Sequence, residues 1–82
     1  MLKDRVFRIA DIYVPVKRHR TLDPAAVEAI AESMLDEGQR TPVLLRRDGE
    51  RLVLVDGLQR LEACRALGEE TIVGILVRVR GH

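Results

Sequence analysis

Residues 52–68 have the sequence LVLVDGLQRLEACRALG. The apolar run 52–55 is typical of a short buried strand, and Asp56 followed by Gly57 is a common turn sequence. The pattern of residues 58–67 then predicts a helix that begins directly after the turn. This stretch therefore predicts a strand, a tight turn and a helix.

A strand that enters a helix through a glycine leaves the first N–H groups of the helix pointing out of the turn. These unpaired donors and the positive end of the helix dipole favour an anion such as phosphate. Arg60 lies in the first helical turn, where its guanidinium can bind the same anion. We predict that this turn is the functional part of the chain. The alternative is an ordinary strand–helix turn with a solvated arginine.

Leu61, Cys64 and Leu67 share one face of this helix, and Gly68 is a natural stop for it. Cys64 lies within that apolar face, so we predict a buried structural cysteine and not a reactive one. Asp56 has two interpretations: it caps the helix by accepting N–H bonds, or it acts as a base or metal anchor in phosphoryl chemistry. The spacing favours capping.

The composition predicts one small α+β domain over residues 1–82. Apolar residues make up 46% of the chain, and the net charge of +1 gives no basic field that would by itself indicate DNA binding. One cysteine excludes an internal disulfide. We find no apolar run of about 18 residues and no signal-peptide core, so we expect a cytoplasmic protein without a membrane partner.

A second helix is predicted upstream. Asp23 is a good N-cap, Pro24 suits the first helical position, and Leu22 and Val27 are spaced as a hydrophobic staple. Gly38 ends the helix. Its predicted apolar face comprises Val27, Ile30, Ala31, Met34 and Leu35.

Four strands are predicted, and the basic segment 17–20 is predicted as an exposed loop. The strands are Val6–Ile9, Val43–Arg47, Arg51–Val55 and Thr71–Val79, of which the middle two form a hairpin. Because the hairpin strands are almost continuously apolar, we expect them to be covered on both faces or central in the sheet. The order is β-α-β-β-α-β, with two main helices on a small mixed sheet.

Residues 9–72 resemble the N-terminal domain of the ParB partition proteins, within the ParB/sulfiredoxin superfamily. The most specific stretches are the basic segment 17–20, residues 33–42 (SMLDEGQRTP) and residues 55–63 (VDGLQRLEA). The last is similar to the ParB sequence in which a glycine, a glutamate and two arginines open a phosphate-binding helix.

The resemblance implies a nucleotide site for CTP or ATP with Mg²⁺, and no tightly bound metal. Its phosphate-side residues would be Gly57, Leu58, Gln59, Arg60, Arg18 and Arg20, and its base or ribose side would include Ser33, Gln39 and Thr41.

This chain departs from the ParB pattern at three positions within residues 57–63. Gly57, Arg60 and Ala63 match it, whereas Leu58, Gln59 and Glu62 stand where ParB has glutamate, arginine and arginine. We expect Gln59 to donate to the phosphates through its amide. Leu58 also occupies the position of the sulfiredoxin cysteine, so we do not expect this site to reduce sulfinic acids.

Three hypotheses follow from these residues and the resemblance. The first is a nucleotide-binding domain of a bacterial chromosome-partition or DNA-regulatory system, with DNA and a second copy of the chain as further expected partners. The second is a nuclease or nucleotide-dependent phosphotransferase of the same superfamily. The third is a non-catalytic dimerisation or docking module with a degenerate pocket.

Overall fold

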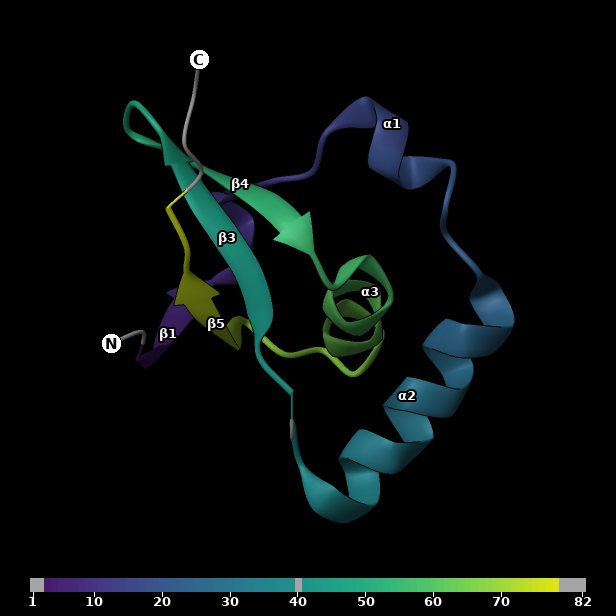
Figure 1. Cartoon of the computed structure of the whole chain (residues 1–82). Helices are drawn as coiled ribbons and strands as arrows, with labels where there is room; N and C mark the ends of the chain where they lie inside the picture. The colour runs from purple at the N-terminus through teal and green to yellow at the C-terminus, as the bar shows by residue number, and fades with distance from the viewer. Residues whose placement is uncertain (1–2, 40, 79–82) are drawn as a thin grey trace.

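In the part of the chain that the computed structural model describes, residues 3–39 and 41–78, five strands form one mixed sheet with the helices on one side of it (Figure 1). The elements in chain order are β1 (Asp4–Arg8), the 3₁₀-helix η1 (Ile9–Asp11), β2 (Ile12–Tyr13), α1 (Val16–His19), α2 (Pro24–Glu37), β3 (Val43–Asp48), β4 (Arg51–Asp56), α3 (Leu58–Ala66) and β5 (Thr71–Leu76). The predicted α+β class is confirmed. No helix of the described residues is long and apolar enough to cross a lipid bilayer.

The sheet has the strand order β1-β5-β3-β4-β2. The pairs β1–β5 and β3–β4 are antiparallel, and β3–β5 and β2–β4 are parallel. The predicted hairpin is present and closes at the pair Asp48 and Arg51.

We expected the hairpin strands to be central in the sheet or covered on both faces. β3 is the central strand. The helices α1, α2 and α3 lie on one side of the sheet (Figure 1). Leu52, Val53 and Leu54 of β4 are nevertheless all buried, although consecutive strand residues point to opposite faces, so the expected cover on both faces holds for this part of the hairpin.

The core lies between the sheet and α3. Leu61 and Leu45 are completely buried, and Leu54 and Cys64 are buried beside them. α2 lies outside α3 and packs on it, with Met34 reaching the core cluster. Because α3 is held against the sheet by buried side chains, its N-terminus has a fixed position relative to β4.

The predicted caps of α2 are confirmed. The Asp23 carboxylate accepts a hydrogen bond from the Ala25 N–H at 3.1 Å, and Gly38 ends the helix with φ +72°. Leu35 is the exception on the predicted apolar face, because it is 72% exposed. Leu35 lies in the last turns of α2, which extend beyond the shorter α3 (Figure 1).

The segment before α2 differs most from the predictions. η1 and β2 were not expected, because each has two or three residues and no periodicity to recognise. The basic segment predicted as a loop begins with one helical turn, α1, in which the Arg18 N–H donates to the Pro15 carbonyl at 2.9 Å. Pro15 has the fixed φ that suits the residue preceding a helix.

Other differences concern the ends of elements. β1 begins at Asp4 and ends at Arg8, and Ile9 belongs to η1. α3 ends at Ala66, one residue earlier than predicted. β5 ends at Leu76, and the predicted end at Val79 lies outside the described residues.

The turn between β4 and α3 requires glycine for two separate reasons. Gly57 has φ +109°, in the left-handed region that residues with a Cβ adopt at a cost. A Cβ built on Gly57 would also lie 2.7 Å from Val43 Cγ1 and 3.2 Å from Val43 Cα. The backbone of α3 therefore starts as close to β3 as van der Waals contact allows.

We predict that Gly57→Ala lowers the free energy of unfolding by about 3 kcal/mol, because it adds a steric clash to the backbone cost. Gly68→Ala is the matched control: Gly68 has φ +77°, but a Cβ there would meet nothing within 4 Å. It should cost only about 1 kcal/mol. Urea denaturation of both variants measures the difference. Equal losses would contradict the clash with Val43.

Candidate functional site

The N-terminus of α3 begins with a glycine in place of a capping side chain. Gly57 is the N-cap residue, and no side chain among the described residues caps the helix there. The N–H groups of Leu58, Gln59 and Arg60 belong to the first helical turn and have no partner within the helix. They point in one direction along the helix axis, as an anion-binding helix start requires.

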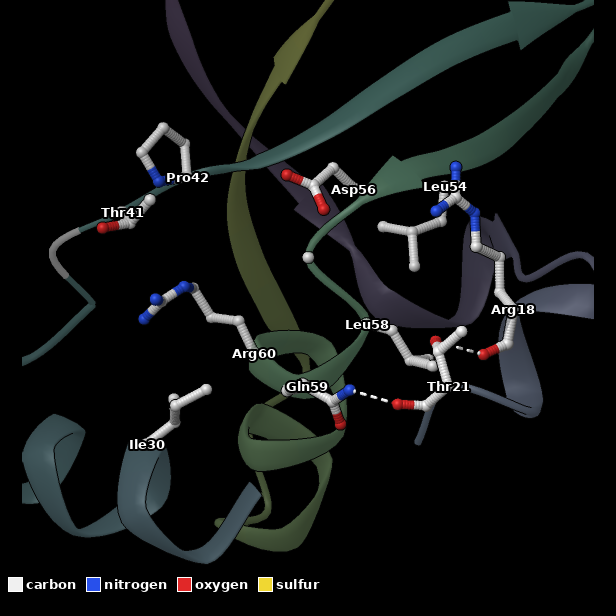
Figure 2. Close-up of a pocket in the computed structure, with 11 residues that line it drawn as sticks. Arg18, Thr21, Ile30, Thr41, Pro42, Leu54, Asp56, Leu58, Gln59 and Arg60 are labelled. Carbon is white, nitrogen blue, oxygen red and sulfur yellow. Dashed lines mark hydrogen bonds between the residues drawn. The ribbon is translucent and has the colours of Figure 1, made fainter. Parts of the chain in front are cut away.

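A cavity of about 280 Å³ lies at this helix start (Figure 2). Residues from four parts of the chain line it: Arg18, Thr21, Ile30, Thr41, Pro42, Leu54, Asp56, Gly57, Leu58, Gln59 and Arg60. Of the nine predicted phosphate-side and base-side residues, the cavity brings together Arg18, Thr41, Gly57, Leu58, Gln59 and Arg60. Arg20, Ser33 and Gln39 are not part of this lining.

Two arginines reach the cavity from opposite sides. Figure 2 shows Arg60 extending from the first turn of α3 to the space below Thr41 and Pro42, while Arg18 extends from α1. The Asp56 carboxylate lies between them at the end of β4. Two guanidinium groups and a helix N-terminus outweigh one carboxylate, so the cavity favours an anion.

Asp56 does not cap α3. It is the last residue of β4, and the N-cap position is taken by Gly57, so the predicted capping role is wrong. Its side chain is exposed and lines the cavity. No group of three or more histidines, cysteines or carboxylates is placed to hold a metal ion within residues 3–39 and 41–78.

Gln59 uses its side chain for contacts within the protein. Its Nε2 donates to the Thr21 carbonyl at 2.6 Å, and its Oε1 accepts from the Asp23 N–H at 2.9 Å. Figure 2 shows the first of these bonds. We expected this side-chain amide to donate to the phosphates. It is instead bonded to the connection between α1 and α2.

Gln39 also makes internal hydrogen bonds. Its Nε2 donates to the carbonyls of Val73 and Thr41 at 2.8 and 2.9 Å, and its Oε1 accepts from the Val73 N–H at 2.8 Å. The side chain pairs with β5 as a strand residue would, just before β3 begins. It fixes the segment that carries Thr41 into the cavity.

Ser33 and Arg20 lie away from the cavity. The Ser33 hydroxyl donates to Glu37 Oε1 at 3.3 Å along α2, and Arg20 is the exposed C-cap of α1.

Cys64 is buried, as predicted, and cannot replace a catalytic thiol. Burial raises the pKa of its thiol, the nearby Glu69 carboxylate raises it further, and Arg60 acts in the opposite direction. A thiol with a raised pKa is mostly protonated at neutral pH and is a poor nucleophile. Leu58, which stands at the position of the sulfiredoxin cysteine, is buried, with 5% of its surface exposed.

Four lining residues were not predicted as site residues: Thr21, Ile30, Pro42 and Leu54. Ile30 and Leu54 were recognised only as apolar positions of a helix and a strand. Thr21 and Pro42 belong to connections whose course depends on tertiary contacts, and no local pattern places them.

The sequence of this chain matches the model of a known protein family. The model of the ParB N-terminal domain matches residues 5–81, nearly the whole sequence. The chain therefore belongs to the ParB N-terminal domain family, and the predicted superfamily is confirmed.

Similar solved structures extend this result. Sulfiredoxin from Arabidopsis thaliana is 22% identical with a TM-score of 0.84, over 94% of this chain and 86% of that one. The C-terminally truncated chromosome-partitioning protein ParB from Caulobacter crescentus, complexed with CTP-gamma-S, is 21% identical with a TM-score of 0.78 over 95% of this chain. A mutant of free serine kinase in complex with ADP is 19% identical with a TM-score of 0.77 over 90% of this chain.

The chain spans only 46% of that ParB structure and 30% of the kinase. At these identities the similarity establishes the fold. Comparison with curated proteins finds no match.

Proposed function

We propose that this chain binds a nucleoside triphosphate with its phosphates at the N-terminus of α3. The observation that carries this proposal is the shared cavity of an uncapped helix start and two arginines, Arg18 and Arg60. Both backbone N–H groups at helix starts and guanidinium groups bind phosphate in proteins. The ligands of two structurally similar proteins, CTP-gamma-S and ADP, support a nucleotide as the bearer of those phosphates.

The lining residues have separate roles in the proposed complex. Gly57 allows the close approach of the phosphates, the N–H groups of Leu58 to Arg60 bind them, and the guanidinium groups of Arg60 and Arg18 neutralise their charge. Thr41 lies on the base or ribose side.

Asp56 gives a reason for magnesium in the proposed complex. A carboxylate next to a free triphosphate would repel it, whereas Mg²⁺ bound to the phosphates would convert that repulsion into attraction. We therefore propose the magnesium complex of CTP or ATP as the ligand, with Asp56 facing the metal.

The proposed cellular role is that of a cytoplasmic partition or DNA-regulatory protein. Membership in the ParB N-terminal domain family supports it. Residues 1–82 would act as a single nucleotide-binding domain, and contacts with DNA or a second copy would depend on surfaces outside the cavity, such as exposed Arg20.

We predict that Arg60→Ala weakens nucleotide binding by about 10- to 100-fold, because a hydrogen bond to a charged group is worth roughly 1.5–3 kcal/mol. Isothermal calorimetry with CTP, ATP, GTP and UTP, each with and without Mg²⁺, measures the affinity. Arg47→Ala is the matched control, since Arg47 is an exposed arginine of β3 outside the cavity lining. The proposal fails if the wild-type chain binds none of the four at millimolar concentration.

Phosphoryl transfer is a second candidate function, favoured by the exposed position of Asp56 in the cavity. A carboxylate there can accept a proton from a water or alcohol that attacks the terminal phosphate, and it can anchor the metal. The prediction is that Asp56→Asn abolishes any release of phosphate from ATP or CTP while the variant still binds nucleotide. Retention of phosphate release by Asp56→Asn would exclude Asp56 as the base.

A further inference from the structure

The Gln59 side chain joins α3 to the connection between α1 and α2. Its amide makes two hydrogen bonds to this connection, one to the Thr21 carbonyl at 2.6 Å and one from the Asp23 N–H at 2.9 Å. Both groups of the amide are used, one as donor and one as acceptor. Because the two backbone groups come from residues two positions apart, the pair of bonds fixes the orientation of the connection as well as its distance from α3.

Thr21 transmits this position to Arg18. The Thr21 N–H donates to the Arg18 carbonyl at 3.0 Å, and the Thr21 hydroxyl donates to the same carbonyl at 2.7 Å. The Arg18 backbone is further tied to Pro15 by its own N–H. A continuous set of hydrogen bonds therefore runs from Gln59 through Thr21 to Arg18, which is one of the two cavity arginines (Figure 2).

Apolar packing contributes little to this connection. Every residue from Val16 to Ala25 is exposed, and α1 has no buried residue. A helix of four residues is too short to be stable alone. Between buried Val14 and half-buried Ala26, hydrogen bonds are the main constraint on where α1 lies.

We propose that Gln59 is a positioning residue that holds Arg18 over the phosphate cavity. This inference rests on the proposed function, since it concerns the affinity of the same site. The resemblance to ParB placed an arginine at this position, with its charge directed at the phosphates. In this chain the side chain acts indirectly, through Thr21, and Arg18 supplies the charge.

A double-mutant cycle tests the inference. Gln59→Met keeps the length of the side chain and removes both hydrogen bonds. Calorimetry with the magnesium complexes of CTP and ATP should show about a tenfold loss of affinity for Gln59→Met in the wild-type background and little further loss in the Arg18→Ala background. Thermal unfolding of each variant confirms that it is folded.

A second measurement needs no ligand. The Asp23 N–H is bonded to Gln59 Oε1, so its hydrogen exchange should accelerate in Gln59→Met. The Val73 N–H is the internal control, because it is bonded to the side chain of Gln39 and should exchange at an unchanged rate.

The outcomes separate the two proposals. If the wild type binds nucleotide and Gln59→Met binds equally well, the positioning role is overturned and the proposed function stands. An equal loss in both backgrounds overturns it as well, because Gln59 would then act independently of Arg18. If the wild type binds no nucleotide, both proposals fail, and exchange at Asp23 still decides whether the hydrogen-bonded link exists in solution.

Discussion

The contact between Gly57 and Val43 determines where α3 begins. With no Cβ at Gly57, the chain leaves β4 with φ +109° and turns into a helix while still touching β3. Leu61 and Cys64 then bury the helix against the sheet, so that its free N–H groups have a fixed direction. The cavity with its two arginines forms around this helix start, and every proposed phosphate contact depends on that geometry.

Two glutamines hold the connections on either side of α2. Gln59 ties the connection before α2 to α3, and Gln39 ties the connection after it to β5. The first connection follows α1, which contains Arg18, and the second contains Thr41; both residues line the cavity. The site thus has a rigid part, built from β4 and α3, and a second part whose position depends on side-chain amides. The resemblance placed both glutamines at the ligand, whereas both amides bond to the protein itself.

The sequence predicted those features that depend on neighbouring residues. The caps of α2, the hairpin and the turn at Gly57 each have a local pattern, and all are present. The roles of Gln59 and Gln39 were missed because all but one of their hydrogen-bond partners lie 34 to 38 residues away in the chain. Asp56 was given a capping role from its spacing, but the strand continues through it and leaves the cap position to Gly57.

All of these proposals require that backbone N–H groups at the start of α3 bind phosphate. Amide chemical shifts recorded by NMR during a titration with the magnesium complexes of CTP and ATP test it most directly. We predict that the largest changes occur at the N–H groups of Leu58, Gln59 and Arg60. Phosphate binding at the helix start would be contradicted if these signals stayed in place while the changes appeared elsewhere, for example between α2 and α3 at Val27 and Ala66.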